Sequence, residues 1–387
     1  MKIHIIGPDD PALAAARQAI SAHPEWNLDL QVTPWAEYRD VLMETLQAEK
    51  APNQAVFVPG HVWIPELVDA GLIANLEPLI TSLPGAIWQD YDWQDIIASI
   101  RRDSSYQGQR YMIPYFNDAH ILFYRGDLID PGQGGPLPEI SPLDLLSLAE
   151  GAHDPPGVYG IALKAHPSEI FFDWLPYFYA AGGIIADAEL QPKFFSDAGI
   201  QALETYCRLR EYAPPDTHTY GNEEIALVLR QGKAALVTTW GGQAAPIFLD
   251  SVNPFRDQYR SAVFPYPCGG TWGFALPANQ SREDQLKALQ TLLVLNSAGM
   301  DQEVLLAAGS PIRAGSYTEE AYQKYSWLRA QHEILQRLVF LPFDPRIGIY
   351  LGHLTEALCD AFLGEKSPRN SLKDANSRIL EAIKESN

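Results

Sequence analysis

The sequence predicts an α/β fold in which most strands lie parallel. Within the first 60 residues, short apolar runs alternate with helical segments, and this alternation is typical of βα units that build a parallel sheet. The 387 residues are too many for one ordinary hydrophobic core, so we expect two domains. A hydrophobic content of 47% with 20% charged residues is that of a globular chain.

Each expected element follows from a local pattern. The apolar run at residues 3–6 stops at Gly7-Pro8, as a buried strand does when it enters a loop. Asp10 followed by Pro11 is a favourable helix start. The first part of the chain is therefore expected to hold strands at 3–6, 28–32 and 55–58 and helices at 10–20 and 36–47. Further on we expect helices at 143–150 and 171–181, a helix with a following strand over 224–240, and two tail helices over 351–383.

The stretch at residues 108–127 is expected to change the direction of the chain. Pro114 has no N–H for a sheet ladder, so we expect the preceding strand to end there and the chain to turn outward. Two aromatic residues and two hydrogen-bonding residues, 115–118, follow directly. An apolar run at 121–124 then resumes as a strand.

Composition and missing motifs exclude several classes of function. The net charge of −20 disfavours nucleic acid and anionic lipid surfaces as partners. No uncharged apolar run is long enough to span a membrane. Known catalytic signatures and phosphate-binding loops are missing, so we expect no catalytic residue and no cofactor. The three cysteines are far apart and form no metal-binding pattern, so we expect no metal; one disulfide and free thiols both stay open.

Several segments resemble one family in their order and spacing. They include Gly-x-x-Tyr-x-x-Pro-Tyr at 108–115, the helix and strand at 224–240, and Ala308-Gly-Ser-Pro-Ile-Arg313. The chain resembles the family 1 extracellular solute-binding proteins of ABC importers, the maltose-binding-protein-like sugar-binding class. This resemblance implies a two-lobed periplasmic-binding-protein-like fold (type II), each lobe a mostly parallel sheet flanked by helices, joined by hinge crossovers near 114, 265 and 312. It implies an N-terminal lobe of 1–114 plus 265–312 and a C-terminal lobe of 115–264 plus 313–387.

The same resemblance implies a function without chemistry. A carbohydrate, either an oligosaccharide or a glycoside, would bind in a cleft between the lobes and favour the closed form. The closed protein, expected to be a monomer, would then dock on the membrane subunits of an ABC permease. We expect a periplasmic or extracellular, membrane-anchored protein whose native export signal is absent from this sequence.

Aromatic residues at strand ends are the main candidates for ligand contacts. A sugar has an apolar C–H face for an aromatic ring and a rim of hydroxyls for polar groups, and ligands of open α/β sheets bind at the carboxyl ends of strands. The aromatic candidates are Trp35, Trp63, Tyr115, Trp174, Trp240 and Trp272. The others are His61, Asn117, Asp118, Gly241, Gly242 and Arg313.

Most candidates also have a purely structural interpretation. Trp35 would cover the start of its helix, His61 would bond to backbone, and Trp174 would be core. Asn117 and Asp118 would form an Asx turn, and Arg313 would hold the third crossover by an ion pair.

Two other functions stay open at this point. One is a carbohydrate-active hydrolase or lyase using a carboxylate pair, Asp118 with Glu169 or Asp173. The other is a cytoplasmic scaffold.

Overall fold

The computed structural model describes residues 2–132, 135 and 137–385. The chain forms two compact units, each assembled from separated segments. Unit 1 consists of Met1–Asp118, Gly270–Lys324 and Phe343–Pro345, and unit 2 of Ala119–Gly269, Tyr325–Pro342 and Arg346–Asn387. The first two changes of unit lie close to the expected crossovers at 114 and 265. Residues 313–324, expected in the second lobe, pack with unit 1 instead.

Unit 1 is built on a sheet with strand order β2-β1-β3-β10. Strands β1 (Ile3–Pro8), β2 (Leu28–Thr33) and β3 (Ala55–Pro59) are parallel, with Ile5 opposite Leu30 on one side and Ala55 on the other. All five residues of β3 are buried, as expected for a central strand. β10 (Gly269–Ala275) pairs antiparallel with β3. The predicted α/β class and the first three strands are confirmed.

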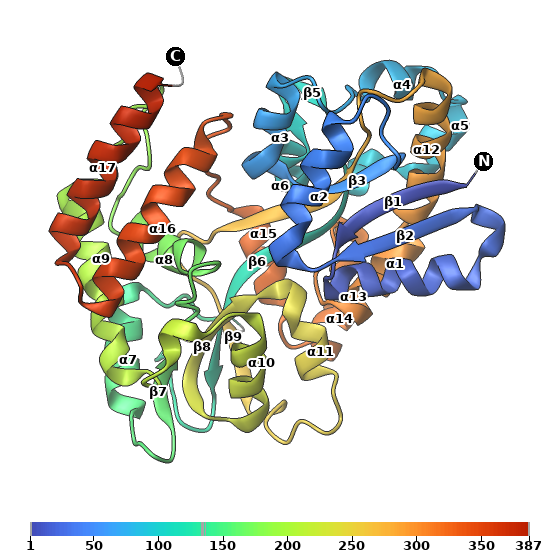
Figure 1. The fold of residues 1–387 in the computed structure, drawn as a ribbon. Helices are drawn as coiled ribbons and strands as arrows, with labels where there is room; N and C mark the ends of the chain where they lie inside the picture. The colour runs from blue at the N-terminus through green and yellow to red at the C-terminus, as the bar shows by residue number, and fades with distance from the viewer. Residues whose placement is uncertain (1, 133–134, 136, 386–387) are drawn as a thin grey trace. The chain divides into compact units, whose positions relative to one another are not determined.

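Helices connect the strands of unit 1 (Figure 1). Helix α1 (Pro11–Ala22) starts as predicted, because the Asp10 side chain accepts a hydrogen bond of 2.9 Å from the Ala12 N–H. Helix α2 (Trp35–Gln47) follows β2, and α3 (Gly60–Asp69) follows β3. The other elements of unit 1 are η1 (Pro24–Trp26), α4 (Glu77–Thr81), α5 (Gly85–Tyr91), η2 (Trp93–Asp95), α6 (Ala98–Asp103), β4 (Ser105–Tyr106), β5 (Gln109–Arg110), α12 (Arg282–Leu295), α13 (Ala298–Ala307), η6 (Ala314–Ser316) and α14 (Glu319–Lys324).

The expected break at Pro114 is wrong. One continuous strand, β6 (Ile113–Arg125), contains Pro114 as its second residue. Proline is tolerated there because the first residues of a strand can lack a ladder donor. Asn117 and Asp118 therefore lie within a strand and form no turn.

Unit 2 has a mixed sheet rather than a mostly parallel one. β7 (Tyr159–Ala162) and β8 (Ala234–Trp240) are parallel, whereas β6 pairs antiparallel with both β8 and β9 (Tyr259–Ala262). β6 enters unit 2 directly as a continuing strand. No crossover helix precedes it, so nothing requires it to run parallel to its neighbours.

Helices cover the sheet of unit 2 and bury its main core. Helices α16 (Ile347–Leu363) and α17 (Pro368–Glu385) lie side by side at the C-terminus (Figure 1). They are separated at Gly364, whose φ of 81° suits glycine at a helix end. All three cysteines are free thiols. The other elements are α7 (Pro142–Ala152), α8 (Ile170–Ala180), α9 (Asp197–Leu209), η3 (Arg210–Tyr212), η4 (Thr217–Thr219), α10 (Asn222–Gln231), η5 (Gly241–Gln243), α11 (Ala244–Phe248) and α15 (Leu328–Gln336).

Candidate functional site

Three of the predicted tryptophans gather on one face of unit 1. Trp35 begins α2 directly after β2, Trp63 lies in α3 after β3, and Trp272 lies in β10 opposite Pro59. The Trp272 ring meets the rings of Trp35 at 4.9 Å and Trp63 at 6.0 Å, edge to face in both cases. Trp35 is 44% exposed and the other two are half-buried. We call Trp35, Trp63 and Trp272 the tryptophan cluster.

An arginine lies over one member of the tryptophan cluster. The guanidinium carbon of Arg39 is 4.8 Å from the centroid of the Trp63 ring. The Nη2 group of Arg39 also donates to the two carboxylate oxygens of Glu66, at 2.9 and 2.8 Å. Arg39 lies one helical turn after Trp35, and Glu66 lies three residues after Trp63, so helical spacing brings both to this face. The carboxylate of Glu66 therefore balances the positive charge that Arg39 places over the Trp63 ring.

Asp103 joins the start of α3 to β10. Its carboxylate accepts the His61 N–H at 2.7 Å and the Thr271 N–H at 2.7 Å, and His61 Nδ1 lies 2.6 Å from the same carboxylate. His61 is buried, so this contact sets the orientation of its ring. A Cβ on Gly60 would lie 2.5 Å from the Asp103 carboxylate, which is why glycine is required there. Asn117 Nδ2 donates to the Thr271 hydroxyl at 3.1 Å.

Tyr115 and Asp118 are not members of the tryptophan cluster. Tyr115 is 2% exposed, and its ring packs edge to face on Phe57 at 6.1 Å and Phe274 at 5.3 Å. Burial raises the pKa of Tyr115 above its ordinary value. These contacts are those of a core residue in unit 1. Asp118 is half-buried and is the last residue of the first segment of unit 1.

In unit 2, Trp240 is held by two charged groups. It ends β8, and its indole N–H donates to Glu169 Oε2 at 2.8 Å. The Lys164 ammonium lies 4.8 Å from the centroid of the Trp240 ring and 2.8 Å from the same glutamate oxygen. The ring is half-buried. Its orientation is thus determined by a hydrogen bond at the edge and a cation on the face.

Asp173 lies in a buried polar network of unit 2. Its oxygens accept hydrogen bonds from the Thr238 hydroxyl at 2.6 Å, the Tyr206 hydroxyl at 2.7 Å and the Lys164 N–H at 3.0 Å. His120 Nε2 lies 2.9 Å from Asp173 Oδ1. Burial alone would raise the pKa of Asp173, but His120 and the two hydroxyl donors hold it below its ordinary value. Asp173 has no oxygen left for acid–base chemistry at a ligand.

The remaining candidates of unit 2 are buried. Gly241 and Gly242 follow Trp240 in a turn, and a Cβ on Gly241 would lie 2.0 Å from the Gln331 side-chain oxygen. Close packing against α15 therefore explains the glycine at 241. Trp174 is fully buried in the core of unit 2, with its ring 4.6 Å from that of Phe178.

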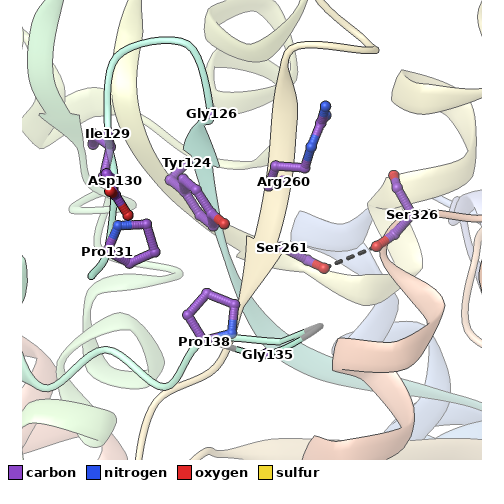
Figure 2. A pocket seen from close by; sticks show the side chains of 10 residues that line it. All are labelled: Tyr124, Gly126, Ile129, Asp130, Pro131, Gly135, Pro138, Arg260, Ser261 and Ser326. Atoms are coloured by element: carbon purple, nitrogen blue, oxygen red, sulfur yellow. Dashed lines mark hydrogen bonds between the residues drawn. The ribbon is translucent and has the colours of Figure 1, made fainter. Parts of the chain in front are cut away.

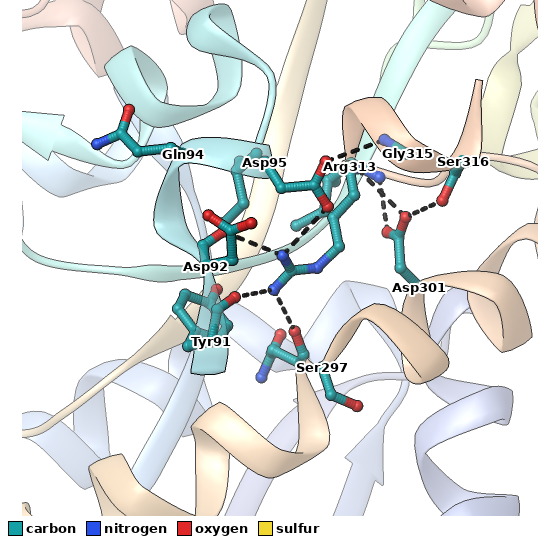
Figure 3. A network of polar contacts seen from close by, with 12 residues as sticks. Tyr91, Asp92, Gln94, Asp95, Ser297, Asp301, Arg313, Gly315 and Ser316 are labelled. Carbon is teal, nitrogen blue, oxygen red and sulfur yellow. Dashed lines mark hydrogen bonds and ion pairs between the residues drawn. The ribbon is translucent and has the colours of Figure 1, made fainter. Parts of the chain in front are cut away.

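Arg313 lies at the centre of a polar network within unit 1 (Figure 3). Its Nη2 donates to the carbonyl oxygens of Tyr91 at 2.8 Å and Asn296 at 3.0 Å, and its Nη1 donates to that of Asp92 at 3.1 Å. The Asp301 carboxylate accepts the Arg313 N–H at 3.2 Å. The side chain is 2% exposed. These contacts join three separated segments of unit 1 and explain why 313–324 belong to it.

A cavity of about 570 Å³ lies elsewhere in unit 2 (Figure 2). Tyr124, Asp130 and Arg260 line it, together with Ser261, whose hydroxyl donates to the Ser326 carbonyl at 2.9 Å. None of the predicted site residues lines it. Its one aromatic side chain, Tyr124, is 8% exposed and offers little ring surface to a sugar. We therefore place the candidate site at the tryptophan faces and not here.

Neither a metal site nor a membrane span is found in the described part of the chain. Within residues 2–132, 135 and 137–385, no three His, Cys, Asp or Glu residues are arranged to hold a metal ion. Across the same residues, no helix is long and apolar enough to cross a bilayer.

Sequence reasoning missed several residues of these faces. The spacing of Arg39 from Trp35 and of Glu66 from Trp63 was a usable signal, because residues three or four apart share a helix face. Asp103 and Lys164 had no such signal. Each reaches its site through contacts that are far apart in the sequence or between different elements.

Comparison with known proteins identifies the family. The profile described as "Bacterial extracellular solute-binding protein" matches residues 8–299. The chain belongs to this family, and the resemblance seen in the sequence is confirmed. A mannitol-binding protein of Pseudomonas aeruginosa is 26% identical over 341 residues, which cover 80% of this chain and 76% of that protein.

Solved structures show the same fold. An ABC transporter solute-binding protein of Agrobacterium radiobacter in complex with ribitol has a TM-score of 0.87 at 21% identity, covering 99% of this chain and 98% of that one. Maltose-bound MalE3 of T. maritima has a TM-score of 0.85 at 15% identity, covering 98% and 99%. A solute-binding protein of Agrobacterium vitis with bound D-mannitol has a TM-score of 0.83 at 16% identity, covering 100% and 99%.

Proposed function

We propose that the protein captures a sugar or polyol for an ABC importer. The observation that carries this proposal is the gathering of Trp35, Trp63 and Trp272 on one face of unit 1. Indole rings cover the C–H surface of a hydroxyl-rich molecule, and nearby polar groups satisfy its hydroxyls. The mannitol-binding relative and the neighbours bound to ribitol, D-mannitol and maltose support the same ligand class.

We propose that Trp240 contributes a second ligand-binding face, in unit 2. Its indole is fixed by Glu169 and Lys164, so little side-chain freedom is lost when a ligand contacts it. The protein would release the ligand unchanged to the membrane subunits of a permease, outside the cytoplasm. The hydrolase alternative loses support, because Asp173 is fully hydrogen-bonded and Glu169 is engaged by Lys164 and Trp240.

Binding measurements with matched tryptophan variants test this function. Calorimetric titration with D-mannitol, ribitol and maltose should give saturable binding of at least one of them, with the ligand recovered intact by chromatography. Trp63→Ala and Trp240→Ala, one in each unit, should each weaken binding about tenfold or more, since an aromatic face is worth about 1.5 kcal/mol or more. Trp88→Ala removes a half-buried tryptophan of α5 outside the tryptophan cluster and should leave affinity unchanged.

Two results would contradict the proposal. Cleavage of the ligand would favour an enzyme. Equal affinities for the wild type and both site variants would place the ligand elsewhere.

A further inference from the structure

Each candidate tryptophan face has a cation over the ring and a glutamate beside that cation. Arg110, Trp88 and Glu77 form a similar group elsewhere in unit 1, outside the tryptophan cluster. In unit 1, Arg39 lies over Trp63 at 4.8 Å and forms two hydrogen bonds to Glu66, at 2.9 and 2.8 Å. The Trp63 ring is thus in a cation–π contact, and Glu66 neutralises the charge of the cation. The Arg39 and Glu66 side chains are partly exposed, at 43% and 35%. A ligand on the tryptophan cluster would therefore interact with the net charge of this pair.

Unit 2 repeats the arrangement with different residues. Lys164 lies over Trp240 at 4.8 Å and 2.8 Å from Glu169, and its ammonium also donates to Asn222 Oδ1 at 2.6 Å. The lysine side chain is 1% exposed and the glutamate 14%. Its charge is balanced and its donors are engaged, so Lys164 offers an incoming anion no free positive charge.

Two buried carboxylates with histidine partners lie near these faces. Asp103 contacts His61 in unit 1, and Asp173 contacts His120 in unit 2. An anionic ligand would lose its hydration at such faces and gain no uncompensated counter-charge. A hydroxyl needs only donors and acceptors, which the partly exposed Arg39 and Glu66 side chains supply in unit 1.

We infer that the ligand is an uncharged polyhydroxyl compound, and that Glu66 and Glu169 are specificity-determining residues that exclude anionic analogues such as aldonates and sugar phosphates. The inference rests on the proposed function, because it concerns the same tryptophan faces. It goes further by naming the charge class of the ligand and the two residues that select it.

The test compares a neutral and an anionic ligand of the same carbon skeleton. Dissociation constants are measured by calorimetry for D-mannitol and D-mannonate with the wild type and Glu66→Gln. We expect the wild type to prefer mannitol at least about tenfold, and Glu66→Gln to narrow this ratio about tenfold, the effect of one uncompensated charge near a ligand. Glu356→Gln is the matched control, since it breaks an exposed pair with Arg378 (2.6 Å) in α16 and α17, away from both tryptophans.

Glu169→Gln gives the parallel test in unit 2. If loss of the buried pair with Lys164 unfolds Glu169→Gln, the affinity ratio of Glu66→Gln alone decides the test. Mannonate binding as tight as mannitol binding in the wild type would overturn the inference. So would an unchanged ratio in Glu66→Gln relative to Glu356→Gln. Both results leave the proposed function intact. Failure of every sugar, polyol and aldonate to bind would overturn the proposed function, and this inference with it.

Discussion

Replacing Arg313 with methionine should destabilise unit 1 without changing the affinity of the folded protein for its ligand. The guanidinium is 2% exposed and donates to three backbone carbonyl oxygens from two separated segments of unit 1. Methionine keeps much of the side-chain volume of Arg313 but has no side-chain hydrogen-bond donor. The sequence left two roles open for this residue, ligand contact and structural support, and this substitution separates them.

The expected loss follows from the contacts. A buried acceptor that loses its donor costs about 1–3 kcal/mol. Relaxation of the surroundings keeps the total for three acceptors below the simple sum. The guanidinium also forms an ion pair with Asp95 at 3.5 Å, and breaking a buried ion pair typically costs about 3–5 kcal/mol. We therefore expect a loss of about 4 kcal/mol, which for a unit of this size lowers the unfolding temperature by about 10 °C.

Thermal unfolding followed by circular dichroism measures this loss, and calorimetric titration gives the affinity of the folded variant. Arg313→Lys keeps the charge but not the planar fork, so it should lose part of the stability. Arg378→Met, which breaks an exposed pair with Glu356, should lose no more than about 1 kcal/mol. A variant as stable as the wild type but with weakened ligand binding would refute the structural role and make Arg313 a ligand contact.

Three further perturbations test other parts of the structure. Burial raises the pKa of Asp301 to about 6, so the folded state binds a proton at this carboxyl more tightly than the unfolded chain does. The stability of the fold therefore falls as the pH rises from about 4 to 6. Asp301→Asn should remove about 3 kcal/mol of that pH dependence, measured by urea unfolding at pH 4 and pH 7. An equal change in unfolding free energy between the two pH values for wild type and variant would contradict this prediction. Gly160→Ala places a Cβ 2.0 Å from a carbonyl oxygen of α7 and should cost about 1–3 kcal/mol, whereas Gly151→Ala meets nothing within 4 Å and should be neutral or stabilising in the same denaturation assay. Thr238→Val removes a donor to Asp173, whose low pKa contributes stability that is present above about pH 4 and is lost as the pH falls, so acid unfolding should move to higher pH; an unchanged acid midpoint would exclude the role of this hydrogen bond.

Local patterns were sufficient for the first strands and helices of unit 1 and for several helices of unit 2. Strand β3 is a run of apolar residues and is buried throughout, and α1 begins at the Asp10-Pro11 signal. Gly232 and Gly364 end helices with φ of 61° and 81°, as glycine after a helical pattern predicts. These features depend on residues a few positions apart, which a single sequence displays directly.

The sequence by itself determined the α/β class and the family, and it indicated the tryptophans as candidates. The expected position at a strand end is wrong for Trp272, which lies in the middle of β10. Only the tertiary structure decided which of those candidates share a face and which are buried: Trp35, Trp63 and Trp272 meet, whereas Tyr115 and Arg313 are enclosed within unit 1. It alone supplied Glu169 and Lys164 as the partners of Trp240. The reason is physical: helix and strand periods are local properties of the chain, whereas burial and charge pairing depend on contacts between distant segments, which no spacing in the sequence encodes.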